Sequence, residues 1–271
     1  MYKLIKYYVK KITPLFLIEL YAIKNRNLKF IGHYQSWNVA KYQCKGYDDP
    51  KLFQKILDSC LKVKNGEAKW ERDSVLFNEI EFNWPLSTVL MWCASLNSNK
   101  INLVDFGGSL GTAYFQNLIF LNHLDNLKWN IIEQNIFVNA GNEHFKSDRL
   151  RFITDFNEIK SEKIDFILFG SSLQYLEDPY KHFLYSMSLK PGFIMIDKTP
   201  FSELDWDVIS KQVVSKNIIE SSYPIHIFSL AKFLKIIEQD WQIISICDAD
   251  EVQLTSCGLK FTFKGIILKR K

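Results

Sequence analysis

The sequence lacks the cysteine spacings and the long apolar runs that mark several protein classes. Its five cysteines are never closer than ten residues apart, so there is no CxxC pair and no zinc-type spacing. We therefore expect no metal site, and we expect reduced, mostly buried thiols in a cytosolic protein. No segment approaches the roughly 18 apolar residues that a membrane-spanning helix needs.

An excess of positive charge is absent outside the N-terminus. The net charge is +4, but residues 1–29 alone carry seven Lys or Arg and a single acid, Glu19. The remaining chain has 27 basic and 29 acidic residues. It lacks the phosphate-binding excess of a nucleic-acid-binding protein, so we expect no nucleic-acid partner.

The first 24 residues are basic and amphipathic. Two interpretations remain open: a helix lying on an anionic membrane surface, or a helix packed on the domain with its lysines in water. The apolar run 12–18 contains Pro14 and stops at Glu19, which is a poor secretory signal. We expect a cytoplasmic protein, peripheral to the inner face of the membrane on the first interpretation. Its oligomeric state is left open.

Helical patterns dominate the first hundred residues. Residues 50–63 carry one apolar stripe after Pro50, and residues 84–96 are almost wholly apolar, which predicts a surface helix and a buried one. Residues 28–49 are interpreted as an ordered loop. We therefore expect a helical N-terminal extension or lid over 1–100.

Beyond residue 100 the pattern changes to short apolar runs separated by helical segments. The runs predict strands at 101–106, 129–133, 150–154, 164–169 and 193–197. Helices are predicted at 111–126, 134–146, 177–188, 203–218 and 229–239, with at most a turn of helix in 155–163. Nearly continuous apolar strands alternating with helices predict an α/β, doubly wound, mostly parallel sheet over 101–271.

The last two apolar runs break this alternation. Residues 241–247 and 259–268 are separated by polar residues without helical period, so they are paired most simply as antiparallel strands. A dinucleotide dehydrogenase would normally continue with another parallel unit instead. A parallel sheet that ends in an antiparallel hairpin is the seven-stranded layout of methyltransferases.

The stretch "LVDFGGSLGTAYFQ" at 103–116 is the main motif. No lysine precedes Thr112, which excludes a phosphate-binding P-loop. Neither Gly107 nor Gly108 starts a complete G-x-G-x-x-G fingerprint, which disfavours a dinucleotide. An acid-x-G-x-G-x-G turn fits better, with Ser109 at the middle glycine position. The expected cofactor-binding residues of this turn are Asp105, Gly107, Gly108, Ser109 and Gly111.

Two further segments are expected at the same edge of the sheet. Glu133 ends a strand 22 residues beyond Gly111, where an acid can accept both ribose hydroxyls, although it would also serve as an exposed cap of the next helix. The loop "GSSLQY" at 170–175 follows the fourth strand and leaves room for a ligand, or is an ordinary polar loop. From these segments we predict cofactor contacts from Glu133, Gln134, Asp155, Ser171 and Ser172, and catalytic roles for Gln174 and Tyr175.

On these residues the chain resembles the class I S-adenosyl-L-methionine-dependent methyltransferases, and within them a bacterial family found with surface-polysaccharide genes. The segments that carry the resemblance are "FIGHYQSWNVAKYQCKGYDD", "WERDSVLFNEIEFNWPL", "LVDFGGSLGTAYFQ", "WNIIEQ", "FGSSLQYLEDP" and "YPIHIFS". The resemblance implies a Rossmann-like fold, S-adenosyl-L-methionine as methyl donor, and a sugar or glycan hydroxyl as acceptor.

A sugar hydroxyl loses a proton on methylation, so a nearby base is expected. His226 is the first candidate and Asp197 the second, although a partly buried, hydrogen-bonded histidine is an equally good interpretation. The substrate-binding residues expected from the N-terminal segments and "YPIHIFS" are Trp37, Tyr47, Arg72, Asp73 and Tyr223. Arg72 would bind an anionic group, or pair with Asp73 to hold the lid. Two other functions remain: a non-catalytic subunit of a glycan-assembly complex and an NAD-binding oxidoreductase.

Overall fold

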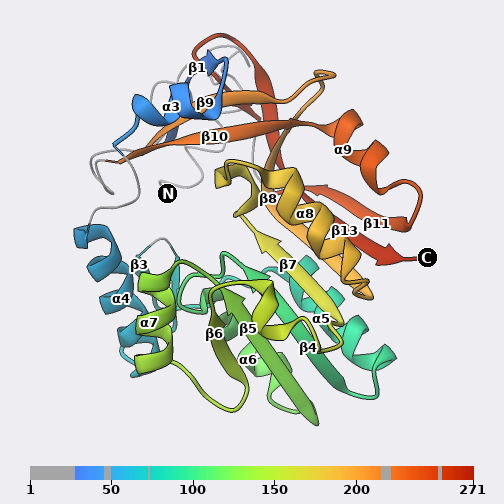
Figure 1. The fold of residues 1–271 in the computed structure, drawn as a ribbon. Helices are drawn as coiled ribbons and strands as arrows, with labels where there is room; N and C mark the ends of the chain where they lie inside the picture. The colour runs from blue at the N-terminus through green and yellow to red at the C-terminus, as the bar shows by residue number, and fades with distance from the viewer. Residues whose placement is uncertain (1–27, 46–49, 73, 215–220, 250–251) are drawn as a thin grey trace, which may run out of the picture.

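The computed structural model describes residues 28–45, 50–72, 74–214, 221–249 and 252–271 (Figure 1). Its core is a seven-stranded sheet in the order β6-β5-β4-β7-β8-β13-β11. In this sheet β13 alone runs in the direction opposite to the other six strands. The strands are β4 (Lys100–Phe106), β5 (Asn126–Ile132), β6 (Leu150–Ile153), β7 (Phe166–Gly170), β8 (Phe193–Ser202), β11 (Trp241–Asp248) and β13 (Lys260–Arg270). The predicted mostly parallel sheet with a terminal antiparallel hairpin is confirmed.

Helices cover both faces of this sheet and close one apolar cluster on each. On one face lie α4 (Pro50–Lys64), α5 (Trp84–Leu96), α6 (Thr112–Leu121) and α7 (Asn135–His144). On the other lie the turn η1 (Phe156–Ile159) and the helices α8 (Pro179–Ser188) and α9 (Leu230–Ile237). The central strands are buried from both sides, which explains why their sequences are continuously apolar rather than alternating.

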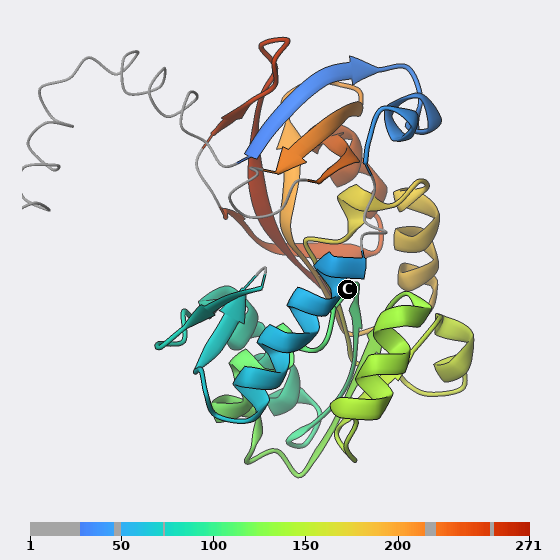
Figure 2. The same ribbon diagram turned by 90° about the vertical axis from the view of Figure 1, so that its left-hand side faces the viewer.

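A second group of strands lies beyond the end of the sheet toward which the arrow of β7 points (Figures 1 and 2). It consists of β1 (Leu28–Tyr34), β9 (Val208–Val214) and β10 (Ser222–Ser229), paired antiparallel in the order β1-β9-β10. Phe30, Ile225 and Ile227 close a third apolar cluster with Phe261 and Phe263, which belong to the first half of β13. This sheet continues into the central one through a short parallel contact between β10 and β8.

Two predictions fail in this group. The helix predicted at 203–218 is the strand β9 within the described residues, and its burial alternates residue by residue as a two-residue period requires. The loop predicted at 28–49 contains β1 and the short helix α3 (Trp37–Tyr42), whose N-cap is Ser36. Both errors have one cause, because β1 and β9 are stabilised by pairing with each other across about 180 residues of chain.

The predicted helical extension over 1–100 is only partly helical. Residues 1–27, and with them the basic segment, lie outside the described residues. The described part holds α3, α4 and α5, but also β1 and a small hairpin of β2 (Trp70–Arg72) and β3 (Val75–Phe77). Within the described ranges, no helix has the length and apolar content needed to cross a bilayer.

Candidate functional site

The glycine turn joins β4 to α6 at the carboxyl edge of the central sheet. Gly107, Ser109 and Gly111 all have left-handed backbone conformations, with φ of 74°, 52° and 98°. The N–H of Gly111 donates to the carbonyl of Gly108 over 3.0 Å, and the N–H of Gly107 donates to Ile132 at the end of β5 over 2.9 Å. Helix α6 therefore starts directly above the ends of two adjacent strands, where its N-terminus faces an incoming ligand.

Asp105 lies beneath this turn rather than in it. Its side chain is only 1% exposed, and its Oδ2 accepts a hydrogen bond from the indole N–H of Trp129 over 3.1 Å. A Cβ on Gly108 would lie 2.5 Å from the same oxygen, so the turn rests on the carboxyl group. Burial raises the pKa of Asp105 to about 7. The predicted cofactor role of Asp105 is thus, on this geometry, to support the turn from below.

Glu133 joins the ends of β4 and β5. Its Oε1 accepts the N–H of Ser109 over 3.2 Å, and its Oε2 accepts the N–H of Gln134 over 2.8 Å. Desolvation raises the pKa of this carboxyl group, while the two backbone donors oppose the rise. The side chain is half-buried at the surface of the turn, so its oxygens can also accept hydroxyl groups of a ligand.

Gln134 and Asp155 flank this position and are exposed. Gln134 is the N-cap residue of α7, and its side chain makes no capping bond. Asp155 follows β6, and its Oδ1 accepts the N–H of Asn157 over 2.6 Å, which caps η1. Both residues stand at the carboxyl ends of neighbouring strands, as predicted from the sequence.

The loop after β7 closes against the glycine turn. A Cβ on Gly107 would lie 2.6 Å from the Cβ of Ser172, so only glycine allows this approach. The Oγ of Ser172 is buried and has no hydrogen-bond partner among the described residues. Ser171 is left-handed, with φ of 57°, and its N–H donates to the carbonyl of Asp197 over 2.9 Å.

Gln174 does not lie where a catalytic residue would. It is fully buried, and its Nε2 donates to the Oγ of Ser171 over 3.0 Å and to the carbonyl of Lys198 over 3.1 Å. Its Oε1 accepts the hydroxyl of Thr199 over 3.4 Å. Both ends of the amide are occupied, so Gln174 ties the loop after β7 to β8, and its predicted catalytic role stays a prediction.

Asp197 is also built into the scaffold. Its Oδ2 accepts a hydrogen bond from the side chain of Asn83 over 2.7 Å, and Asn83 caps α5 by accepting the N–H of Leu86. The side chain is 8% exposed, and burial raises the pKa of its carboxyl group. Through Asn83, the carboxyl group connects the start of α5 to the middle of β8, and it has little surface left for a substrate.

His226 on β10 and Trp37 on α3 lie in contact. Neither their spacing in the sequence nor the composition could reveal this contact. Their rings stack at 4.8 Å with an interplanar angle of 11°. The His226 Nε2 is buried and has no hydrogen-bond partner among the described residues, and burial lowers the pKa of the ring. The lowered pKa keeps the imidazole neutral near pH 7, with its Nε2 lone pair unpaired among the described residues.

Tyr175 and Tyr223 meet edge to face at 5.5 Å on the neighbouring surface of β10. The Tyr175 hydroxyl donates to the Oε1 of Gln212 on β9 over 2.9 Å. Both tyrosines are only partly buried. They link the loop after β7 to the β1-β9-β10 sheet, so that sheet stands over the carboxyl edge.

Arg72 pairs with Glu81 at 3.2 Å, and its guanidinium lies 5.5 Å from the Trp70 ring and 5.6 Å from the Phe77 ring. Asp73, its alternative partner, and Tyr47 lie outside the described residues. The sequence analysis missed the residue beside Arg72: Glu71 is 4% exposed and accepts the hydroxyl of Thr112, the first residue of α6. Successive residues of β2 point to opposite faces, yet Trp70 and Glu71 are both buried, so the alternation of "WER" gave no signal for Glu71.

No family model matches this chain, and no curated protein matches it. Several solved structures are similar at a distance. The N-terminal domain of EvdMO1, determined in the presence of SAH and D-fucose, is 10% identical, with a TM-score of 0.47 over 84% of this chain and 100% of that one. The 1,6-didemethyltoxoflavin-N1-methyltransferase of Burkholderia thailandensis is 13% identical, with a TM-score of 0.41 over 83% and 92% of the two chains. CalS10, an amino pentose methyltransferase from Micromonospora echinaspora, is 8% identical, with a TM-score of 0.42 over 68% and 89%.

Proposed function

We propose that this chain is a methyltransferase that uses S-adenosyl-L-methionine and methylates a hydroxyl group of a sugar or glycan. The observation that carries the proposal is the pairing of Glu133 with the glycine turn at the carboxyl ends of β4 and β5. Ligands of open α/β sheets bind at this edge, beside the point where the strand order reverses. Here β4 lies between β5 and β7, so the glycine turn stands at that reversal.

The sheet itself argues against an oxidoreductase that binds a dinucleotide. Such sheets continue with parallel strands in the order 3-2-1-4-5-6. In this chain the antiparallel strand β13 is inserted between β8 and β11. The glycine turn also carries Ser109 at the position where a dinucleotide fingerprint requires glycine. A donor without phosphate groups fits this turn better than a pyrophosphate does.

The residues present fit the donor at three places. The ribose hydroxyls would bind Glu133, the adenine would lie between Gln134 and Asp155, and the methionine end would lie along Gly107–Gly111. The buried Ser172 Oγ would gain the partner that it lacks among the described residues. Gly107 and Gly108 let the turn pack directly against Ser172 and Asp105, because a Cβ at either position would displace these neighbours.

When bound, the donor supplies a methyl group activated on a positively charged sulfur. The contribution of the chain is to align an acceptor hydroxyl with that methyl group and to take the hydroxyl proton, because the transfer is an in-line displacement. His226 Nε2 is our first candidate for the proton acceptor, since its ring is neutral and an acceptor hydroxyl would satisfy it. Trp37 would hold the ring in place. Tyr175 and Tyr223 would line the acceptor side, and Asp197 ranks second as a base because Asn83 occupies it.

The acceptor assignment rests on the resemblance to methyltransferases of surface-polysaccharide genes. The alternative is a non-catalytic, methyltransferase-like subunit of a glycan-assembly complex, which the basic N-terminus favours. Incubating the protein with labelled donor and with lysate fractions of protein, lipid and polysaccharide distinguishes these functions. Label in the polysaccharide or lipid-linked glycan fraction is expected. Label in the protein fraction alone would contradict a glycan acceptor, and donor binding without any transfer would favour the non-catalytic subunit.

Donor binding is tested by calorimetric titration with adenosylhomocysteine and with NAD. We expect adenosylhomocysteine to bind and Glu133→Ala to weaken it by about tenfold or more, because a charged acceptor of two hydroxyls is removed. Glu143→Ala on the exposed face of α7 is the matched control and should leave the affinity unchanged. Tight binding of NAD without any response to adenosylhomocysteine would overturn the proposal.

A further inference from the structure

Strand β8 contains a bulge at the carboxyl edge of the sheet. Between the pairs Ile196–Ile266 and Thr199–Lys264, β8 has two residues, Asp197 and Lys198, where β13 has only Gly265. The extra residue exchanges the faces of the strand. Before the bulge, Phe193 and Met195 face the α5 side, whereas after it Phe201 faces the α8 and α9 side. Bulges of this kind often lie next to active sites, where they redirect a side chain.

Lys198 is the residue whose backbone absorbs this irregularity. It is left-handed, with φ of 46°, although it is neither glycine nor asparagine. This conformation costs an L-residue about 1 kcal/mol or more. Gln174 holds it in place by donating to its carbonyl over 3.1 Å. Strain that is held by buried neighbours at a ligand-binding edge points to a functional side chain.

The side chain of Lys198 is exposed. Within the part of the chain that the structure describes, no hydrogen bond or ion pair to its ammonium group is found. Lys198 interacts electrostatically with Asp197. Burial raises the pKa of the Asp197 carboxyl group, whereas the positive charge of Lys198 lowers it. Asp197 is held by a hydrogen bond from Asn83 to its Oδ2, and no ion pair between Asp197 and Lys198 is found among the described residues.

Lys198 is connected to the glycine turn through residues that contact one another. Gly107 closes against Ser172, Ser171 binds the carbonyl of Asp197, and Gln174 bridges Ser171 and Lys198. The glycine turn and the loop after β7 follow the carboxyl ends of β4 and β7, and Asp197 in the middle of β8 pairs with Gly170, the last residue of β7. The lysine therefore stands at the same edge as the proposed donor site, on the side of β8 rather than on the side of β5, where Glu133 lies.

We propose that Lys198 binds an anionic group of the acceptor, so that the acceptor is an acidic sugar: one that carries a carboxylate or a phosphate. This inference rests on the proposed function. The donor is a cation, and an ammonium group at the same edge repels it, an effect that a negative charge on the acceptor would offset. An acidic acceptor provides that charge, and the lysine then gains the partner that the fold does not give it.

The test compares Lys198→Gln with Lys190→Gln by calorimetry. Lys190 is a matched control because it is also left-handed, with φ of 53°, but it lies at the opposite, amino end of β8. The probes are glucuronate, glucose 1-phosphate and neutral glucose, titrated into protein with and without adenosylhomocysteine. We expect at least one acidic probe to bind about tenfold more tightly than glucose, with the difference lost in Lys198→Gln and kept in Lys190→Gln. Which acidic probe binds distinguishes a carboxylate from a phosphate.

Two results would overturn this proposal: acidic probes that bind no better than glucose, or a preference that survives in Lys198→Gln. Failure of the proposed function is recognised separately, because adenosylhomocysteine would then not bind either variant or the parent protein. A third variant, Lys198→Gly, removes the backbone strain together with the ammonium group. It should unfold at the same or a higher temperature and still lose the preference for acidic probes. A lower unfolding temperature would mean that Lys198 serves the fold instead.

Discussion

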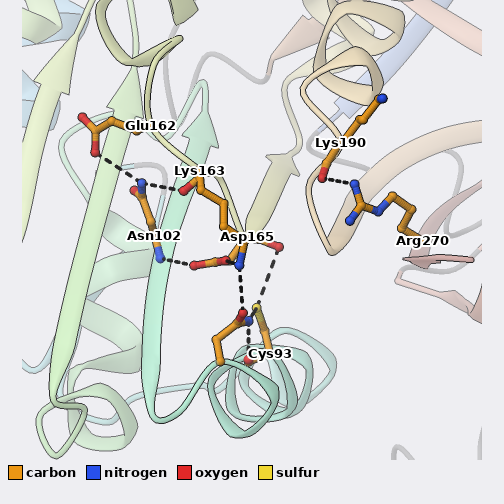
Figure 3. A network of polar contacts seen from close by, with 8 residues as sticks. Cys93, Asn102, Glu162, Lys163, Asp165, Lys190 and Arg270 are labelled. Carbon is orange, nitrogen blue, oxygen red and sulfur yellow. Dashed lines mark hydrogen bonds and ion pairs between the residues drawn. The ribbon is translucent and has the colours of Figure 1, made fainter.

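The two edges of the central sheet differ in how far their polar groups are paired by hydrogen bonds and ion pairs. At the amino edge, Asp165 accepts the N–H of Asn102 over 3.0 Å and pairs with Lys163 at 2.8 Å, while its own N–H donates to the carbonyl of Asn102 (Figure 3). Asn102 in turn bonds Glu162 and the carbonyl of Lys163. At the carboxyl edge, the Ser172 Oγ has no partner within the described ranges, and Lys198 carries no ion pair there.

Backbone strain follows the same division. Both edges contain left-handed residues other than glycine, but their positions differ. At the amino edge, Asn99 and Lys190 follow helices, where a left-handed residue is an ordinary way to end a helix. At the carboxyl edge, Ser109, Ser171 and Lys198 follow or interrupt strands. The amino edge is thus built for stability, whereas the carboxyl edge keeps strained and unpaired groups that a ligand can use.

The largest expected effect is on the glycine turn. Gly108→Ala would place a Cβ 2.5 Å from the buried Asp105 carboxyl group, which cannot move away because Trp129 binds it. The turn must therefore shift, and we expect adenosylhomocysteine affinity to fall by about 100-fold, or roughly 3 kcal/mol. Calorimetry measures the affinity, and circular dichroism shows that the variant folds.

Gly170→Ala is the control at the same edge. A Cβ there would meet only Leu168, at the ordinary distance of 3.8 Å. This variant should keep its affinity within about twofold. Equal losses in the two variants would mean that any added side chain at this edge disturbs the site, so that the support from Asp105 is not special.

At the amino edge the expected effect is on stability alone. Asp165→Ala leaves the N–H of Asn102 without its acceptor and removes a buried carboxylate, so the free energy of unfolding should fall by about 2–3 kcal/mol. Lys163→Ala, whose side chain is 80% exposed, should cost about 0.5 kcal/mol or less. Urea unfolding measures both. A folded Asp165→Ala variant with weakened adenosylhomocysteine binding would contradict the assignment of stability to the amino edge and of ligand binding to the carboxyl edge.

The buried Asp105 predicts a pH dependence. Its pKa is raised to about 7, above the value of an unfolded chain. The folded protein therefore holds a proton that the unfolded chain has released, and stability falls as pH rises from about 4 to about 7. Asp105→Asn keeps an acceptor for Trp129 and has no charge to bury. Relative to the parent protein it should gain on the order of 2 kcal/mol between pH 5 and pH 8 in urea unfolding. A difference that does not change with pH would show that Asp105 is not the group that titrates.

The central sheet and its helices could be predicted from sequence because their signals are local. Continuous apolar strands, amphipathic helices and the capped start of α5 at Asn83 each occupy one short segment. The β1-β9-β10 sheet could not be predicted, since Phe30 and Gln212 pair across about 180 residues of chain that include β4 to β8.

The candidate site divides in the same way. The glycine turn and Glu133 lie within one strand-helix-strand unit, and sequence spacing places them together. Gln174 and Asp197 have polar side chains at the correct edge, yet buried partners occupy them, which no spacing reveals. Lys198 was missed for a related reason: the bulge that exposes it depends on Gly265, 67 residues further along the chain.

The smallest expected effect concerns Ser109, which stands at the middle glycine position of the turn. Its φ is 52°, a left-handed conformation that is strained for serine and unstrained for glycine. Ser109→Gly keeps the N–H that donates to Glu133, so we expect adenosylhomocysteine affinity to stay within about twofold. The free energy of unfolding should rise by about 0.5–1 kcal/mol, because the left-handed strain is removed. The gain stays small, since glycine also makes the unfolded chain more flexible. Lys190→Gly should gain a similar amount at the amino edge. If Ser109→Gly instead lost about tenfold or more in affinity, the serine hydroxyl would contact the donor, and strain at the carboxyl edge would serve binding directly rather than only shape the turn.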